Sequence, residues 1–303
     1  MAHLFADVAN ARTQEELSSA YGMLLAEESA ALLNVLGPSY VGDIAAGASN
    51  VIRVTDYDSA ASNGYASRTE VQAISPTDPA PAKTEVTVAR YGFARQPSDL
   101  VKMTDSHGVL NPVLLAQDML IGANQKLVEL IAGLMPNFSA TAGSAAAAAS
   151  VDDFFDACSE LRQANANGQL IAMLHAKQWG DLSKELATTS GGAIQFAPAT
   201  QDALISRGSG FQGTLNGVQI YTSNRVTADA GGYRGGIFTT DAIAWADGTP
   251  VVEAPESQVL IGKVLFEIDR KPLTAQTDYV GNVWLGVAER QDGAGITFLS
   301  STT

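Results

Sequence analysis

The residues that most often act as bases or metal ligands are sparse in this chain of 303 residues. Its three histidines, His3, His107 and His175, lie far apart, and none has a second His or Cys at metal-ligand spacing. The single cysteine, Cys158, excludes a disulfide within the chain and a zinc site built from cysteines. Because Cys158 lies in an apolar helical pattern, we expect it to pack as a small hydrophobic side chain. We therefore predict no catalytic residues, no cofactor and no metal, and a protein that is not an enzyme.

One glycine pattern resembles a nucleotide-binding loop. Residues 208–213 have the sequence Gly-Ser-Gly-Phe-Gln-Gly, which matches the GxGxxG of dinucleotide sites. In such sites the glycines open a helix whose N-terminus meets the pyrophosphate. Residues 214–221 instead predict a turn followed by a strand, so the context argues against nucleotide binding. The GxSxG pattern of serine hydrolases does not occur in the sequence.

Composition and charge limit the kinds of partner. The net charge is −14, and charged residues make up 17% of the chain, against roughly 25% in ordinary soluble domains. A free nucleic-acid binder normally carries a basic balance, which argues against a repressor or a polymerase accessory. A container whose wall touches DNA only loosely is still compatible with this charge. Few charges are also typical of a surface that partners cover, although composition alone favours a soluble protein rich in small residues.

Length and hydropathy set the scale of the fold. A chain of 303 residues that is 46% hydrophobic can form two compact lobes. No segment approaches the ~20 uninterrupted apolar residues of a membrane span. The N-terminus lacks the basic start of a secretory signal. We therefore expect no membrane contact and a chain made in a cytoplasm.

Two helices are predicted in the first half of the chain. Residues 13–16 fit a capping box, and leucines at helical spacing follow as far as Leu36, so residues 13–36 predict an amphipathic helix after a short arm. Asn111 and Pro112 are typical of a helix start. The run from there to Pro136 predicts a helix of about 24 residues, or roughly 36 Å, long enough to span one lobe.

Residues 50–97, between these helices, predict a long β-excursion. Strand-like runs occur at 51–54, 70–74 and 83–93, with a proline-rich turn at 75–81. No apolar face of this segment is large enough to build a core of its own, and a two-stranded ribbon is marginal alone in water. We therefore expect this segment to lie on its own body or on a neighbour.

The second half of the chain predicts an α/β lobe followed by strands. Residues 139–150 contain mainly Ser, Ala, Thr and Gly and predict a linker or hinge. Helices alternate with short buried strands from 150 to about 248, which is typical of a compact α/β lobe. The strand-like tail from 251 to 300 is expected to return to the lobe that carries the long helix.

The order of these elements resembles the HK97-type major capsid proteins of tailed phages. Four phrases carry the resemblance in the family's order, at residues 94–100, 170–182, 213–226 and 235–245. The resemblance implies an α+β fold with an N-terminal arm, a β-hairpin called the E-loop, a P-domain with a long spine helix, and an α/β A-domain. It implies the following division of the chain: an arm and helix at 1–49, the E-loop at 50–97, the P-domain at 98–149, the A-domain at 150–248, and a returning β segment of the P-domain at 249–303.

The resemblance also implies a function. The protein would self-assemble as pentamers and hexamers into an icosahedral shell around phage dsDNA, touching the DNA loosely. The shell would be assembled in the host bacterial cytoplasm and would form the capsid of the virion, with scaffold, portal and decoration proteins as possible partners. A fused scaffold is not expected, because the chain opens almost directly on the arm. Lys–Asn cross-linking is not expected either, because Lys83 is the only lysine of the ribbon.

Charged residues of the β-excursion are the candidate contacts between subunits. They are Arg53, Arg68, Glu70, Lys83, Glu85 and Arg90. Each of them also fits a simple solvated loop charge, because exposed ion pairs contribute only about 0–1 kcal/mol.

Three alternatives remain open. An encapsulin, a bacterial shell that holds cargo enzymes, would share the fold. An α/β enzyme on residues 150–248 would need convergent titratable groups, for which the sequence offers only His175, Asp181 and Asp202. A phage tail or decoration protein would not need a long helix between a β-ribbon and an α/β lobe.

Overall fold

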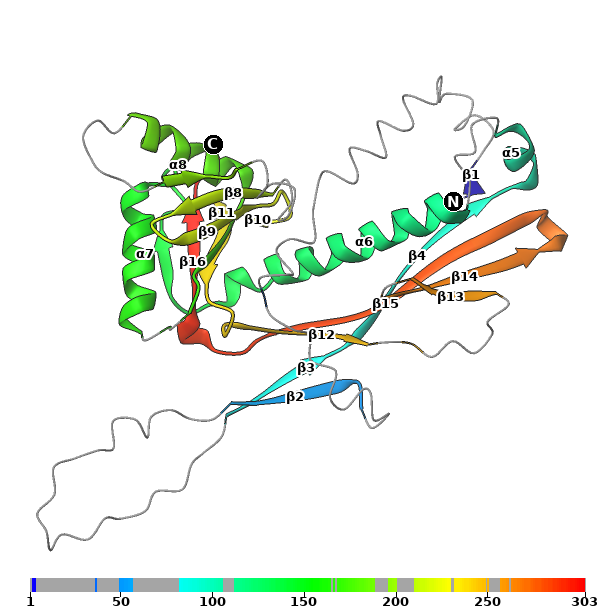
Figure 1. Ribbon diagram of the computed structural model, residues 1–303, viewed down its shortest axis with the longest axis horizontal. Helices are drawn as coiled ribbons and strands as arrows, with labels where there is room; N and C mark the ends of the chain where they lie inside the picture. Colours follow the sequence, from blue (N-terminus) through cyan, green and yellow to red (C-terminus); the bar gives the residue numbers. More distant parts are fainter. Residues whose placement is uncertain are drawn as a thin grey trace, which may run out of the picture.

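The computed structural model describes the chain in several stretches. They are residues 2–3, 36, 49–56, 82–105, 112–164, 166, 168–188, 196–200, 210–229, 232–248, 250, 257–261 and 263–302. The predicted helix at 13–36, except Leu36, and the strand-like run at 70–74 lie outside them. Within the described stretches the fold is α+β, with an α/β lobe, an elongated lobe along a long helix, and a short ribbon below both (Figure 1).

The α/β lobe is built on an eight-stranded sheet. Its strands run in the order β5-β16-β11-β6-β9-β8-β7, with β10 paired to β11. Their bounds are β5 Thr141–Gly143, β6 Ile171–Leu174, β7 Phe196–Pro198, β8 Phe211–Leu215, β9 Val218–Thr222, β10 Ala228–Asp229, β11 Gly232–Phe238 and β16 Gly295–Ser300. Strand β6 is buried at every position, as its continuous apolar run predicts.

Two helices belong to this lobe, α7 (Val151–Gln163) and α8 (Ala176–Thr188). The Ser150 side chain caps α7 by accepting a hydrogen bond from the Asp153 N–H at 3.1 Å, which is the usual role of a serine at a helix N-terminus. Phe154 of α7 is fully buried and lies edge-on to Phe298 of β16, with ring centroids 6.0 Å apart. The contact joins the helix to the middle of the lobe's core.

The elongated lobe is a six-stranded sheet with a helix along it. The strand order is β1-β4-β15-β14-β13, with β12 paired to β15. The bounds are β1 Ala2–His3, β4 Ala89–Pro97, β12 Ile243–Gly248, β13 Gln258–Ile261, β14 Val264–Lys271 and β15 Gln276–Glu289. Helix α6 (Pro112–Ala132) runs along this sheet (Figure 1). Its 21 residues confirm the predicted long helix. The observed helix ends at Ala132, whereas the predicted helix extended to the residue before Pro136.

The helix packs closely on the sheet because glycines leave room for it. A Cβ on Gly281 of β15 would lie 2.7 Å from the Met119 sulfur of α6. The hydrophobic cluster under α6 continues into the α/β lobe through residues such as Met135, Ile171 and Phe238. This cluster therefore links the two lobes, while a second cluster around Phe154 and Phe298 lies within the α/β lobe.

Three segments differ from their predicted places. Residues 141–143 of the predicted linker form β5, which pairs in parallel with β16. Strand β12 was expected in the α/β lobe, yet it pairs with β15 of the elongated sheet. Strand β16 was expected in the lobe of the long helix, yet it pairs with β11. The alternating pattern of a strand predicts which of its faces is buried but not which sheet the strand joins. Because β12 and β16 each pair in the other sheet, the predicted boundary at 248/249 does not separate the two sheets.

The ribbon itself consists of β2 (Val51–Asp56) and β3 (Ala82–Thr87), paired antiparallel. The predicted strand at 83–93 is divided at Val88, because β3 belongs to the ribbon while β4 pairs with β15. One nearly continuous stretch of chain therefore leaves the ribbon and enters the elongated sheet.

Candidate functional site: the root of the ribbon

The ribbon root, defined here as β2, β3 and the surface beneath them, has an apolar stripe. Ile52, Val54, Val86 and Val88 are buried together, and Val86 is completely inaccessible. They pack against Ala244 and Ala246 of β12, with Trp284 and Ala288 of β15 beside them. Residues 50–97 were expected to lie on their own body or on a neighbour, and this part of the segment lies on its own body. The alternation of β2 buries one face of the strand, and β12 and β15 supply the surface that receives it.

The surface under the ribbon is made of small residues. Gly286 of β15 pairs with Ala246 of β12, so a floor of alanine and glycine faces the ribbon. A Cβ on Gly286 would lie 2.6 Å from the Thr87 carbonyl oxygen and 3.1 Å from a Val86 methyl carbon. The backbone of β3 can approach this closely only because position 286 has no side chain.

An ion pair fixes the far end of β2 to the body. The Arg290 Nε donates to both carboxylate oxygens of Asp56 at 2.8 Å, and its Nη2 also contacts Oδ1. The exposed side-chain fractions are 20% for Arg290 and 11% for Asp56, so water screens this pair little. Bidentate pairs of this kind fix geometry as well as contributing energy.

Arg290 has a second acidic partner on the body. Its Nη1 lies 3.4 Å from Asp241 Oδ1, and the Asp241 side chain is 48% exposed. The Thr84 hydroxyl of β3 donates to the Arg290 carbonyl at 3.4 Å. Residue 290 therefore contacts both ribbon strands and the body. Sequence reasoning missed Asp56 and Arg290 because they are 234 positions apart and no local pattern links them.

Two of the predicted contact residues pair with each other. Arg53 and Glu85 are opposite one another on β2 and β3, and the Arg53 Nε lies 3.1 Å from Glu85 Oε1. Their side chains are 64% and 58% exposed, so the pair contributes little to stability. Lys83 is exposed on the same outer face, opposite Thr55. These three charges face away from the apolar stripe, and their contact with neighbouring subunits stays a prediction.

Arg90 belongs to a polar ladder on its own sheet. Its Nε donates to Asn282 Oδ1 at 3.0 Å, and the Asn282 amide donates to Glu267 at 3.3 Å. Gln258 donates to the other oxygen of Glu267 at 2.8 Å. The ladder crosses β4, β15, β14 and β13, so Arg90 links strands of one sheet. Arg68 and Glu70 lie outside the described residues.

The titratable side chains that an α/β enzyme on residues 150–248 would need make structural contacts instead. His175 stacks on Tyr233 with ring centroids 3.8 Å apart, its Nδ1 accepts a hydrogen bond from the Lys177 N–H, and burial lowers its pKa. Asp181 lies 3.1 Å from Lys177 Nζ and 3.6 Å from Lys184 Nζ. Asp202 lies outside the described residues. His175 and Asp181 thus show the packing of structural side chains.

Other features that could carry chemistry are also accounted for by packing. Cys158 is buried, as expected, and burial raises the pKa of its thiol to about 11. Residues 211–222 form the β8–β9 hairpin, which turns at Asn216 and Gly217 with positive φ, so no helix follows the glycine pattern.

Among the described residues, no group of three or more His, Cys, Asp or Glu is placed to hold a metal ion. In the same part of the chain, no helix is both long and apolar enough to cross a membrane.

A cavity of about 460 Å³ lies between α6 and the elongated sheet. Its lining includes Tyr91 and Phe93 of β4 and Met119 of α6. Arg95 and Asp118 at this cavity form an ion pair at 3.0 Å. The walls are thus mainly apolar, and these two charges neutralise each other.

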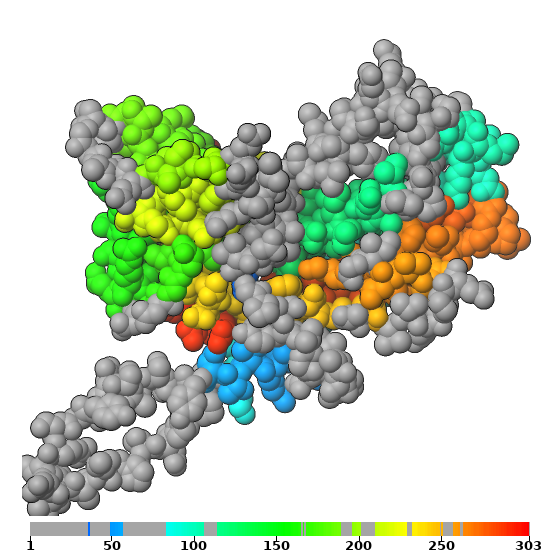
Figure 2. All heavy atoms as spheres, viewed as in Figure 1, coloured from blue at the N-terminus to red at the C-terminus, as the bar shows by residue number. Residues whose placement is uncertain are grey.

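The far end of the elongated lobe carries exposed apolar side chains. Short helix α5 (Asp99–Thr104) and the turn between β14 and β15 form this end, coloured turquoise and orange in Figure 2. Leu273 is fully exposed, Met103 is 84% exposed and Leu100 is 61% exposed. We call these three residues the apolar tip.

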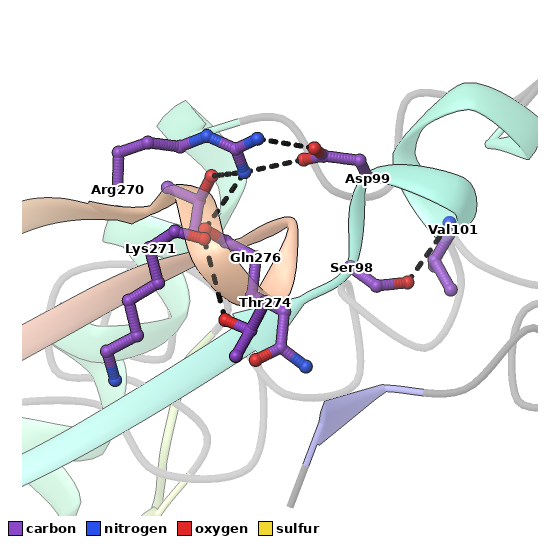
Figure 3. A network of polar contacts seen from close by, with 8 residues as sticks. Ser98, Asp99, Val101, Arg270, Lys271, Thr274 and Gln276 are labelled. Carbon is purple, nitrogen blue, oxygen red and sulfur yellow. Dashed lines mark hydrogen bonds and ion pairs between the residues drawn. The ribbon is translucent and has the colours of Figure 1, made fainter.

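A polar network joins α5 to the turn between β14 and β15. Arg270 donates to Asp99 through both terminal nitrogens and also to the Gln276 carbonyl at 2.9 Å (Figure 3). The Ser98 hydroxyl accepts from the Val101 N–H at the start of α5. A hydrogen bond from Lys271 lowers the pKa of Asp278. The network therefore joins the two segments that carry the apolar tip.

Comparison with solved structures finds chains of similar fold in phages and in a bacterial encapsulin. No protein-family model and no curated protein matches the sequence. Among solved structures, a Mycobacterium phage Che8 chain has 16% identity and a TM-score of 0.52, with 90% of this chain and 91% of that chain covered. The capsid of Ralstonia phage GP4 has 10% identity and a TM-score of 0.60, with 82% and 83% covered. The holo-SrpI encapsulin complex of Synechococcus elongatus has 11% identity and a TM-score of 0.58, with 90% and 87% covered.

These similarities extend over nearly the full length of both chains, which a shared motif or single lobe would not produce. They agree with the order of elements in the described residues, from the ribbon through the long helix to the α/β lobe. The chain therefore has the α+β, HK97-like capsid fold that the resemblance in its sequence predicted.

Proposed function

We propose that this chain is the major capsid protein of a tailed phage, which self-assembles into the icosahedral shell around the dsDNA genome. The observation that carries the proposal is whole-chain similarity to shell subunits, such as the 90% and 91% coverage with the phage Che8 chain. Assembly would use pentamers and hexamers of this chain, in the host cytoplasm and then in the virion. The protein would act through its surfaces and not as an enzyme.

Two surfaces of the described residues support assembly. The apolar tip exposes Leu100, Met103 and Leu273 to water in the single chain, and exposed apolar groups of this kind are typical of sites that a partner covers. A second copy of the chain would cover them in a shell. The ribbon carries Arg53, Lys83 and Glu85 on the face turned away from its apolar stripe, where a neighbouring subunit could pair with them.

Electron microscopy of the purified chain tests the proposal directly. We expect closed shells of uniform size when the protein is concentrated, alone or with a scaffold protein. The variant with Leu273 and Met103 both changed to Asp should keep the circular dichroism of the wild type and lose the shells. A wild-type chain that stays monomeric at high concentration under all these conditions would contradict the proposal.

An encapsulin is the second candidate, because the encapsulin match covers 90% of this chain. Both candidates form shells, so particle contents and gene context must separate them. Terminase and portal genes beside the coding sequence would support the phage capsid. A neighbouring cargo enzyme that is found inside purified particles by mass spectrometry would support the encapsulin.

A further inference from the structure

The ribbon root combines a directional contact with a non-directional one. Apolar packing of Val86 and its neighbours on a flat floor of alanine and glycine keeps the ribbon close but fixes no angle. The bidentate contact of Arg290 with Asp56 does fix an angle, because both carboxylate oxygens must face the guanidinium group.

Arg290 is held in place from the body side. It directly follows Glu289, the last residue of β15, its N–H donates to the Ala242 carbonyl at 2.8 Å, and its Nη1 lies 3.4 Å from Asp241 Oδ1. The guanidinium therefore keeps an acidic partner on the body even when the ribbon moves. Asp56 is the ribbon's half of the contact.

Gly286 sets the height of the ribbon above the same floor. Any side chain at this position would meet the backbone of Thr87, and backbone cannot rotate away as a flexible side chain does. A methyl group at 286 must therefore lift or tilt β3, while Arg290 pulls the end of β2 downward.

We propose that Arg290 and Gly286 are positioning residues that set the angle at which the ribbon leaves the body, and so determine where it meets the neighbouring subunit. This inference rests on the proposed shell function. A change in this angle would move the outer-face charges Arg53, Lys83 and Glu85 relative to the body, so shell geometry should respond to the two positions.

The first test changes the charge contact. Arg290→Gln removes the bidentate contact, Arg290→Lys keeps the charge without the two-point geometry, and the double variant with Asp56→Arg and Arg290→Asp restores the pair in reverse. Arg225→Gln is the matched control, since Arg225 lies 3.5 Å from Glu129 on the body, away from the ribbon. Hydrogen exchange of the amides in 51–56 and 82–87 should rise at least 10-fold in Arg290→Gln, with exchange in the α/β lobe unchanged.

Shell formation is the second readout of the same variants. We expect Arg290→Gln and Arg290→Lys to give irregular or no shells, the reversed pair to recover regular shells in part, and Arg225→Gln to resemble the wild type. Regular wild-type shells from Arg290→Gln, together with unchanged exchange in the ribbon strands, would overturn the inference.

The second test keeps every charge and adds a methyl group to the surface under the ribbon. Gly286→Ala should give irregular shells and faster exchange in 82–87, whereas Gly293→Ala should change neither, because nothing lies within 4 Å of a Cβ there. Normal shells from a folded Gly286→Ala chain would overturn the role of this position, even if Arg290→Gln failed to fold.

The outcomes separate the inference from the proposed function. If the wild-type chain forms no shells, the proposed function fails, while hydrogen exchange on the dispersed chain still decides whether Arg290 and Gly286 hold the ribbon. If wild-type shells form and the variants form the same shells, only the positioning role fails.

Discussion

The α/β lobe and the ribbon root are stabilised in different ways. In the lobe, side chains such as Phe154 and Phe298 are enclosed between a sheet and helices, and neither is accessible to water. In the ribbon root, a single apolar stripe lies on a floor of small residues, and Arg290 fixes its end. The lobe therefore owes its stability to many mutually enclosed contacts, whereas the ribbon owes its position to a few contacts that can be changed one at a time.

The largest effect is expected in the lobe core. Phe154→Ala should lower the free energy of unfolding by about 3–5 kcal/mol, because it removes a fully buried ring that contacts Phe298. Chemical denaturation followed by circular dichroism measures the loss. Asp152→Ala, at an exposed position in the first turn of the same helix, is a surface control. A loss in the free energy of unfolding below about 1 kcal/mol would show that removing a buried ring from the lobe core costs no more than changing a side chain of the ribbon.

A buried polar contact in the lobe should have the next largest effect. Gln178 is fully buried, accepts from the His175 N–H, and donates to the carbonyls of Tyr233 and Phe298. Gln178→Leu would leave these backbone groups without their partner, at a cost of about 1–3 kcal/mol in the free energy of unfolding.

Gln163→Leu is the matched control, because Gln163 makes an exposed hydrogen bond to Ser159. Denaturation curves of the two variants should differ clearly in midpoint. Equal midpoints would mean that the bonds of Gln178 do not join β11 and β16 to α8.

The ribbon stripe should respond locally. Ile52→Ala removes a buried side chain, so exchange of the amides in β2 and β3 should rise several-fold. The unfolding midpoint of the lobe should change by an amount equivalent to less than about 1 kcal/mol, because Ile52 belongs to a separate apolar cluster. A cooperative loss of protection in both regions would contradict the distinction between them.

The smallest effect is expected on the outer face of the ribbon. Arg53→Ala and Glu85→Ala should each lower the free energy of unfolding by no more than about 1 kcal/mol, because both side chains are more than half exposed. If a neighbouring subunit uses these charges, the same variants should weaken shell assembly at moderate salt. Parallel measurements of stability and assembly would separate the two roles.

Sequence patterns correctly predicted the helices and turns that are determined by neighbouring residues. The start of α7 at Ser150, the long helix α6 and the β8–β9 hairpin all follow from residues next to one another in the chain. The order of these elements was sufficient to indicate the fold. Among the predicted contact residues, the structure places Arg53, Lys83 and Glu85 on one face of the ribbon, while their contact with a neighbouring subunit stays a prediction.

Only the tertiary structure determined how these elements join. Strands β12 and β16 have buried patterns that fit either sheet, because backbone hydrogen bonds are the same in both. The match between Gly286 and Thr87, and between Arg290 and Asp56, depends on segments that meet only after folding. Local propensity determines which strands and helices form, but the position of the ribbon depends on contacts between residues some 200 positions apart along the chain.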